Sequence, residues 1–239
     1  MYNAQPMSEQ LQPVPSADLT PTHRYISFPA IVDSLRDFKG RLLEVGFGRG
    51  DLAVVLARRG IDVTAIDSRP LAAHFATVRN PDTTAKFEQA DIVDFHASES
   101  FDAAVSTAVL HCSTSQEQLQ NVLRGVAENL KRGAAFTSVF LHPDFQSDQD
   151  RMIAGRLFRR VDDQRVQIES VLEEGVIVRS PVITLFTKCQ YEKSALEAGF
   201  SSCEWKDLFP NTEGRQVCDD ELWGSAATKA LYAMLTLRK

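Results

Sequence analysis

Short runs of apolar residues alternate along the chain with segments in which apolar residues recur every three or four positions. The run at 42–45 leads into a glycine-rich turn and then into Leu52, Val55 and Leu56, and this segment stops at Gly60. The runs indicate buried strands, and the spacing of three to four indicates helices. Five strands alternating with helices predict a parallel sheet with right-handed crossovers. The predicted strands cover residues 42–45, 62–66, 86–92, 101–111 and 134–141. The ranges of the third and fourth strands include the loop that follows each strand.

Capping residues predict where two of the helices begin and end. Ser68 is expected to cap a helix that runs to about Arg79. Ser115 and Gln118 have the spacing of a capping box at the start of a strongly amphipathic helix. That helix is expected to end at 131–133, where two cations and a glycine suit a helix C-terminus.

The pattern changes after residue 141. Residues 145–160 are polar, with one short helix expected, and three strands follow that predict an antiparallel flap. A further helix precedes two final strands. The expected flap strands are 165–169, 176–178 and 182–186; the helix is 191–198; the last strands are 201–208 and 230–237.

Composition limits the class of protein. The chain has 239 residues and a formal net charge of −6, so it lacks the basic surface expected of a nucleic-acid-binding protein. Its four cysteines are scattered, which argues against a disulfide framework or a zinc site and favours a reducing cytoplasm. No apolar run approaches the ~20 residues of a membrane span, and no secretory signal is visible. Residues 1–21, rich in Gln, Pro and Ser, are expected to be a disordered tail before a domain at 22–239.

The turn at 44–50 carries the clearest chemical signal. A dinucleotide-binding turn needs G-x-G-x-x-G, but the position of its last glycine holds Asp51, which would face a pyrophosphate. The turn instead reads acidic-x-G-x-G-x-G, which is similar to motif I of the class I S-adenosylmethionine (SAM) methyltransferases. SAM has no phosphate and carries an ammonium and a sulfonium, which suit the acid at Glu44. An ordinary strand-to-helix turn in an α/β protein is the structural alternative.

Other strand ends carry further signals. Asp67 ends the second strand, where a carboxylate can accept both ribose hydroxyls of a nucleoside, whether from SAM or from NAD. The resemblance implies that Asp91 binds the adenine amino group and that Ile92 packs on the adenine ring, although an Asp at a strand exit is also a common helix cap. Phe101-Asp102 before the fourth strand matches the family as well. At the last turn the usual Pro-Gly-Gly is replaced by residues 132–134.

The resemblance covers residues 22–239 and implies a fold as well as a cofactor. It implies a Rossmann-like, doubly wound, seven-stranded sheet that is parallel except for an antiparallel C-terminal hairpin. A small antiparallel flap is expected as a substrate-covering insertion at about 142–188. The implied cofactor is SAM, with S-adenosylhomocysteine (SAH) as its product. The candidate cofactor-binding residues are Tyr25, Glu44, Gly46, Phe47, Gly48, Asp67, Ser68, Asp91, Ile92 and Thr107.

Tyr25 precedes an expected helix with Pro29 in its first turn. In SAM methyltransferases such an N-terminal helix closes over the cofactor, which makes Tyr25 a candidate contact. The alternative is that Tyr25 packs this helix against the sheet.

The C-terminal third resembles a narrower group. Residues 187–200, then Trp205, Glu213-Gly214 and Trp223, are similar to the toxoflavin-type (azapteridine) N-methyltransferases, and Leu110-His111 fits the same group. This resemblance implies N-methylation of a flat nitrogen heterocycle in secondary metabolism.

Methyl transfer from a sulfonium is an in-line displacement that depends mainly on positioning and on excluding water. A neutral ring nitrogen needs no strong base, whereas a phenol or an N–H acceptor does, and His111 is the candidate base, followed by His142. Both histidines have an alternative as buried residues bonded to backbone, and Trp205 has one as a core residue. The candidate substrate pocket comprises Ala108, His111, Phe140, His142 and Trp205.

Several activities lack their signatures. Residues 106–109 lack the loop of DNA adenine methyltransferases, and no proline precedes Cys112 as cytosine-5 methylation requires. Residues 142–144 offer too few carboxylates for a catechol-type metal site, so no metal is expected. The sequence predicts a methyltransferase acting on a small-molecule acceptor, as a monomer or homodimer without nucleic-acid or membrane partners. O-methylation of a phenol or carboxylate, a non-catalytic SAM-binding subunit and an NAD-dependent oxidoreductase are the alternatives.

Overall fold

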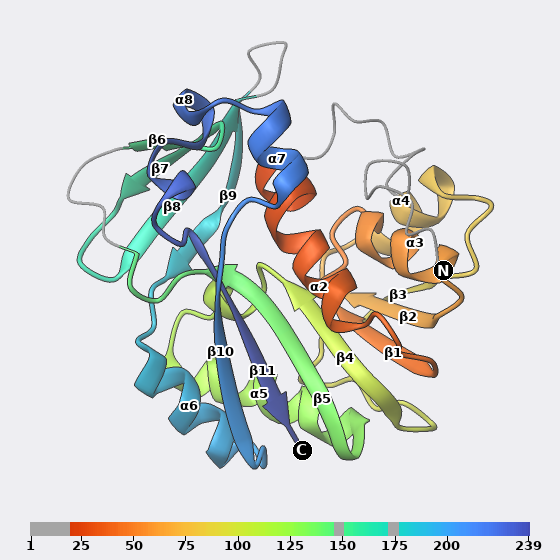
Figure 1. Ribbon diagram of the computed structural model, residues 1–239. Coiled ribbons are helices and arrows are strands. Elements are labelled where there is room, and N and C mark those ends of the chain that lie inside the picture. Colours follow the sequence, from red (N-terminus) through yellow and green to blue (C-terminus); the bar gives the residue numbers. More distant parts are fainter. Residues whose placement is uncertain (1–19, 146–150, 172–176) are drawn as a thin grey trace.

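The computed structural model in Figure 1 describes residues 20–145, 151–171 and 177–239, so most of the expected tail lies outside it. The large sheet has seven strands in the order β10-β11-β5-β4-β1-β2-β3. All neighbouring pairs are parallel except those of β11, which runs antiparallel to β10 and β5. The predicted sheet and its C-terminal hairpin are confirmed. Its strands are β1 (Arg41–Val45), β2 (Asp62–Asp67), β3 (Lys86–Gln89), β4 (Phe101–Thr107), β5 (Leu130–Leu141), β10 (Ser202–Leu208) and β11 (Tyr232–Arg238).

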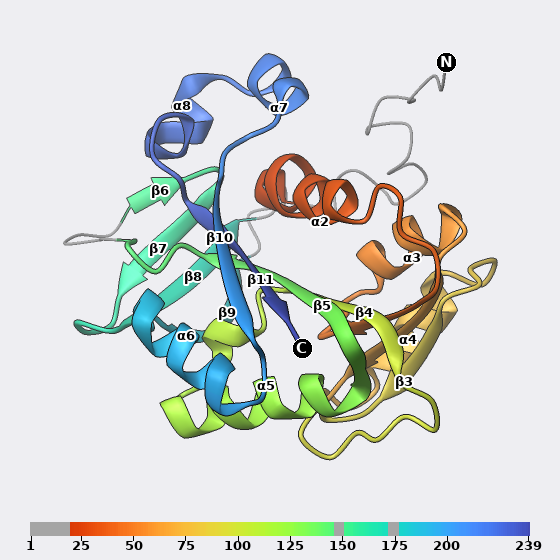
Figure 2. The ribbon, with the colours of Figure 1, turned by 60° about the horizontal axis from the view of Figure 1, so that its bottom comes forward.

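Helices cover both faces of this sheet and divide its apolar residues into two cores, as expected for strands buried on both sides (Figure 2). On one face lie η2 (His23–Ser27), α2 (Phe28–Ser34), α3 (Asp51–Arg58) and α4 (Ala72–Arg79). On the other lie α5 (Gln116–Asn129) and α6 (Lys188–Glu197). Gly125 of α5 is required by this packing, because a Cβ there would lie 2.2 Å from the carbonyl oxygen of Ile92.

A separate antiparallel sheet, in the order β6-β7-β8-β9, follows β5 in the chain. Its strands are β6 (Arg151–Ile153), β7 (Arg156–Arg160), β8 (Arg165–Val171) and β9 (Ile177–Thr184). It lies beside three short helices, α7 (Thr212–Val217), α8 (Asp220–Trp223) and η4 (Gly224–Ala227), which connect β10 to β11 (Figure 1). The Ala154 N–H donates to the Leu222 carbonyl at 2.7 Å, which ties the β6–β7 turn to α8. The expected flap is therefore a four-stranded sheet.

Several expected element ends are wrong. Ser68 does not cap α4, which begins at Ala72 after Leu71 adopts a left-handed φ of 63°. The reason is local, since the N–H of Arg69 bonds the Asp67 carboxylate and holds the chain in a turn. Ser115 does cap α5 by accepting from the Gln118 N–H at 3.1 Å. The Gln118 side chain, however, accepts from Thr114 rather than closing the box on Ser115.

Long-range pairing shifts three other boundaries. Residues 131–133 belong to β5 rather than to the end of α5, because Leu130 already pairs with Phe101. The short helix expected within 145–160 is wrong for its described part, which forms β6 and β7. β9 continues through Ser180-Pro181, which were expected to split it, because an edge strand tolerates proline.

The helix predicted at 191–198 begins earlier, at Lys188. Thr187 and Gln190 form a capping box there, and its Thr-x-x-Gln spacing is a local signal that the predicted start did not use.

Candidate functional site

The glycine turn between β1 and α3 is closed on two sides, by the loop that follows β4 and by Phe87 of β3. Gly46 has a φ of 74°, its N–H donates to the Ile66 carbonyl at 2.7 Å, and a Cβ on it would lie 2.3 Å from Cγ2 of Val109. Gly50 has a φ of 85°, and a Cβ there would lie 2.7 Å from the Phe87 ring. Glycine is required at both positions by backbone conformation and by space. The turn is thereby held against the loop that follows β4.

Glu44, the last but one residue of β1, is the most unusual group in the site. Its side chain is only 1% exposed, and one carboxylate oxygen, Oε2, has no hydrogen-bond partner among the described residues. Burial, together with the charges of Asp51 and Asp67, raises the pKa of Glu44 to about 8. An unsatisfied buried carboxyl group costs stability and is expected where a ligand completes its bonding.

Asp67, at the end of β2, joins the glycine turn to the chain that follows. Its Oδ2 accepts from the Gly48 N–H and from Nη2 of Arg69, each at 2.9 Å, and its Oδ1 accepts from the N–H and Nε of Arg69. Although burial acts to raise the pKa of Asp67, these hydrogen bonds outweigh it and the pKa is lowered. Both oxygens that were predicted to accept ribose hydroxyls are therefore held by Arg69.

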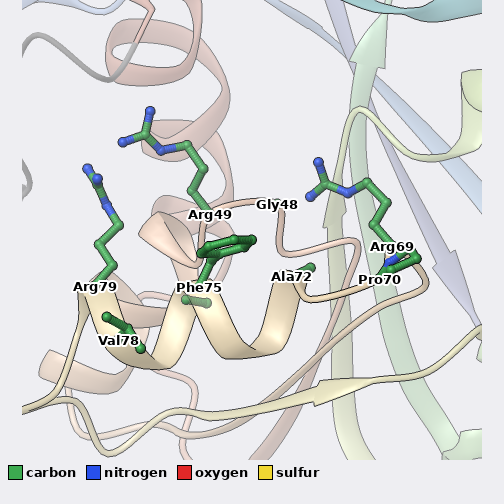
Figure 3. Close-up of a pocket in the computed structure, with 9 residues that line it drawn as sticks. Gly48, Arg49, Arg69, Pro70, Ala72, Phe75, Val78 and Arg79 are labelled. Carbon is green, nitrogen blue, oxygen red and sulfur yellow. The ribbon is translucent and has the colours of Figure 1, made fainter.

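A cavity of about 510 Å³ opens beside this ion pair (Figure 3). Arg49, Arg69 and Arg79 surround an apolar wall on α4 that includes Phe75 and Val78. Arg49 and Arg79 each lie 3.8 Å from an oxygen of Asp51 at the start of α3. Asp51 is thus buried against two cations at the helix N-terminus, where a dinucleotide fold would place a pyrophosphate.

The exits of β2 and β3 present their residues differently. Ser68 and Asp91 are exposed, and Asp91 Oδ1 accepts from the Val93 N–H at 3.0 Å. Ile92 is buried in the core on the α5 face of the sheet. Phe47 is buried in the opposite core, with its ring centroid 5.1 Å from that of Phe87.

The exit of β4 contains a strained residue. Ala108, immediately after Thr107, has a φ of 57°, which a non-glycine residue rarely adopts. Its N–H donates to the Val139 carbonyl at 2.8 Å, and its carbonyl accepts from Sγ of Cys112. The strained backbone places Val109 against Gly46, so two segments far apart in sequence meet at the site.

Tyr25 lies in η2 against the C-terminal helices. Its ring packs edge-on to that of Trp223 at 6.2 Å, and a Cβ on Gly214 would touch its side chain. The Tyr25 carbonyl accepts from the Asn211 N–H at 2.8 Å. These contacts of Tyr25 tie η2 to α7 and α8.

His111 is buried in η3 (Leu110–Cys112), just beyond β4. Its Nδ1 accepts from the Leu141 N–H at 3.3 Å, so the neutral ring carries its proton on Nε2. Burial and the positive charge of Arg156 lower the pKa of His111 to about 4, and the carbonyl of Ala108 only partly opposes this. His111 is therefore neutral near pH 7.

His142, at the end of β5, is held at both ring nitrogens. Its Nδ1 accepts from the Asp144 N–H at 3.0 Å, and its Nε2 lies 3.1 Å from Oδ1 of Asp207 on β10. In the neutral ring Nε2 then donates to Asp207.

Phe140 and Trp205 lie together in an aromatic cluster beneath α6. The Phe140 ring is 4.6 Å from that of Tyr191 and 6.0 Å from that of Trp205, and Trp205 Nε1 donates to Glu192 of α6 at 2.8 Å. These contacts of both residues pack α6 on the sheet. Phe140 also meets His111 edge-on at 6.4 Å, so the cluster borders the exit of β4.

Three residues near the site were not singled out from the sequence. Arg69 follows Asp67 by two positions, and this short spacing is a local signal for an ion pair between them. Arg156 on β7 and Tyr232 on β11 meet through a hydrogen bond of 3.1 Å between residues 76 apart in the chain. No local pattern predicts that contact.

Two kinds of feature are absent from residues 20–145, 151–171 and 177–239. No three His, Cys, Asp or Glu side chains in these ranges are grouped to hold a metal ion. No helix in the same ranges has the length and apolar character to cross a membrane.

Comparisons with known proteins agree with this geometry. Residues 42–133, from β1 to the start of β5, match the family described as "Methyltransferase domain". An uncharacterized methyltransferase of Synechocystis sp. is 33% identical over 102 residues, which make up 43% of this chain and 47% of that protein. The chain therefore spans about half the length of this curated relative.

Solved structures share the whole fold. A SAM-dependent methyltransferase from Mesorhizobium loti has a TM-score of 0.64 at 18% identity, over 94% of this chain and 100% of that one. SAM-bound CalS10, an amino pentose methyltransferase from Micromonospora echinaspora, has a TM-score of 0.61 at 16% identity, over 89% and 90% of the two chains. The fold is thus the Rossmann-like fold of these SAM-dependent methyltransferase structures, and residues 42–133 match the methyltransferase-domain family.

Proposed function

We propose that this protein is a SAM-dependent methyltransferase that methylates a small-molecule acceptor, most favourably on a ring nitrogen. The observation that carries the proposal is the buried Glu44 carboxyl group, whose Oε2 has no described partner beside the glycine turn. Burial keeps much of the Glu44 carboxyl group protonated near pH 7 without a ligand, and a bound cation would favour its ionised form. Such a site suits a cationic ligand and opposes a pyrophosphate. This reasoning favours SAM over NAD.

The residues at this site have the chemical groups that SAM requires. Glu44 would hold its positively charged part, and Asp67 its ribose. When bound, SAM would supply a methyl group on a sulfonium, and an acceptor lone pair would attack the methyl carbon in line while the C–S bonding electrons stay on the departing sulfur. The protein's own contribution is to hold both partners and to exclude water, worth roughly 7–11 kcal/mol of the barrier. We assign the covering role to η2 and the small sheet within residues 142–188.

The state of His111 supports a ring-nitrogen acceptor. A general base must be free to accept a proton near its working pH, but Nδ1 of His111 already accepts from Leu141 and its pKa is lowered to about 4. A neutral imidazole with its proton on Nε2 donates a hydrogen bond instead. A heteroaromatic nitrogen uses its own lone pair and needs no base, whereas a phenol does. We therefore assign His111 to orienting the acceptor.

The test combines binding with turnover. Calorimetry should show that SAM and SAH bind and that NAD does not, and mass spectrometry should show the addition of one methyl group to a nitrogen heterocycle together with loss of SAM. Binding of NAD in preference to SAH would contradict the proposal. Binding of SAH with no turnover across heterocycle and phenol panels would point to a non-catalytic SAM-binding subunit.

Replacing Arg69 with alanine is expected to tighten SAH binding by about 2- to 5-fold. In the wild-type protein the ribose must displace Arg69 from Asp67, and breaking that ion pair costs at most about 1 kcal/mol. Arg69 is 63% exposed, so its interaction with Asp67 is screened by water. Calorimetric titration of both proteins with SAH measures the change. Arg36→Ala, which removes an exposed arginine paired with Asp33 on α2, is the matched control. Weaker binding by Arg69→Ala would show that Arg69 contacts the ligand directly.

A further inference from the structure

Arg156 on β7 has no counter-ion of its own among the described residues. Its Nη1 donates to the Tyr232 hydroxyl at 3.1 Å, and its Nε is buried without a hydrogen-bond partner in the same part of the chain. A guanidinium that is partly buried beside a neutral phenol, with a donor unsatisfied, is costly to keep. Such an arrangement is expected where an anion from outside the chain completes the contacts.

The surroundings of Arg156 do not neutralise its charge. Burial and this charge lower the pKa of His111 to about 4 and that of His23 to about 3. Both rings are therefore neutral near pH 7. Arg156 is the one cation whose charge acts on either ring among the described residues. The charge of Arg156 thus acts on two neutral histidines, and its Nη1 donates to the uncharged hydroxyl of Tyr232.

Arg156 lies at the edge of the sheet where the proposed acceptor would be held. Tyr232, which positions it, pairs with Leu141 at the end of β5, and the N–H of Leu141 donates to His111. β4, β5 and β1 are parallel, so their carboxyl ends share the edge that carries the glycine turn. Ligands of open α/β sheets bind at this edge. Arg156 is the first residue of β7 in the small sheet, and this sheet lies on the side of the molecule away from α3 (Figure 1).

We propose that Arg156, steadied by Tyr232, binds a carboxylate on the methyl acceptor, so that the substrates are small heteroaromatic carboxylates. This inference rests on the proposed methyltransferase function and narrows its substrate class. A single guanidinium fork matches the two oxygens of one carboxylate, whereas a doubly charged phosphate would call for further cations. Paired with Arg156, the carboxylate is an anchor, and the methyl group goes to another atom of the acceptor.

The test uses matched probes with the full chain saturated with SAH. Nicotinate and nicotinamide both have a ring nitrogen, and only nicotinate carries a negative charge. Benzoate and benzamide differ in charge in the same way but have no ring nitrogen. The wild-type protein is expected to bind each carboxylate about 10- to 100-fold more tightly than its amide, the range for a hydrogen-bonded charge. Calorimetry or NMR titration measures both affinities. Phenyl phosphate provides the third arm, and tighter binding of it than of benzoate would overturn the carboxylate assignment.

Variants connect the preference to Arg156. Arg156→Gln is expected to abolish the carboxylate preference, and Arg156→Lys to retain part of it because the charge remains without the fork. Arg160→Gln, on the same strand but at an exposed arginine paired with Asp163, should leave the preference unchanged. In Arg156→Gln the NMR-measured pKa of His111 should also rise, because one of the two causes of its depression is removed.

The possible failures are distinguishable. If the wild-type protein does not bind SAH, the proposed function fails. If it binds SAH but shows equal or undetectable affinity for both members of each pair, only the assignment of Arg156 fails. This second comparison needs no variant, so it holds even if Arg156→Gln does not fold.

Discussion

Glu44→Gln is expected to weaken SAH binding by about 10- to 100-fold, because a charge-assisted contact worth ~1.5–3 kcal/mol is lost. The same substitution is expected to stabilise the ligand-free protein at pH 8. The pKa of Glu44 is raised in the folded protein from 4.5 to about 8. Below pH 4.5 the Glu44 carboxyl group is protonated in both the folded and the unfolded state, so its ionisation does not change the stability. As the pH rises from 4.5 to about 8, Glu44 ionises in the unfolded chain before it ionises in the folded protein, so the free energy of unfolding falls. The loss amounts to a few kcal/mol and is complete above pH 8.

Denaturant unfolding of both proteins at about pH 5, 6.5 and 8, with calorimetry for SAH, measures these effects. The stability of the wild-type protein should fall relative to the variant across this range. Glu204→Gln on β10 removes an exposed carboxylate and is the control. Parallel pH profiles for wild type and Glu44→Gln would contradict the raised pKa. Unchanged SAH affinity would remove Glu44 from the binding site.

Gly46→Ala is expected to destabilise the protein by about 2–5 kcal/mol and to abolish measurable SAH binding. The left-handed φ of 74° costs a non-glycine residue ~1–2 kcal/mol. The new Cβ would lie 2.3 Å from Cγ2 of Val109, and relieving such an overlap costs typically 1–3 kcal/mol more. Thermal or denaturant unfolding gives the first quantity, and calorimetry the second.

Two controls separate backbone strain from the clash. Gly60 has a similar φ of 83°, but no described atom lies within 4 Å of the place that a Cβ would take, so Gly60→Ala should cost only the backbone term. Val109→Ala combined with Gly46→Ala should recover part of the loss, and the double-mutant cycle gives the coupling. An equal loss of stability for Gly46→Ala and Gly60→Ala would exclude the contact with Val109 as a cause.

The order and type of most elements follow from local sequence. Apolar runs and helical spacing located β1, α3 and the amphipathic α5, because burial on a sheet face leaves a periodic pattern in the chain itself. The glycine turn after Glu44 was equally evident, since only glycine accepts its backbone angles. Boundaries were less well predicted where another strand decided them. Residues 131–133 have the composition of a helix end, yet pairing with β4 places them in β5.

The sequence by itself determined the alternation of strands and helices, the acidic strand ends and the glycine turn of this protein, because each depends on neighbours within a few residues. Only the tertiary structure decided that Oε2 of Glu44 is left without a partner among the described residues, that Arg69 holds both oxygens of Asp67, and that Phe140 and Trp205 pack under α6. It also brought Arg156 to Tyr232 across 76 residues. These features arise where loops from different strands meet at one edge of the sheet, and no local pattern encodes which side chains meet there.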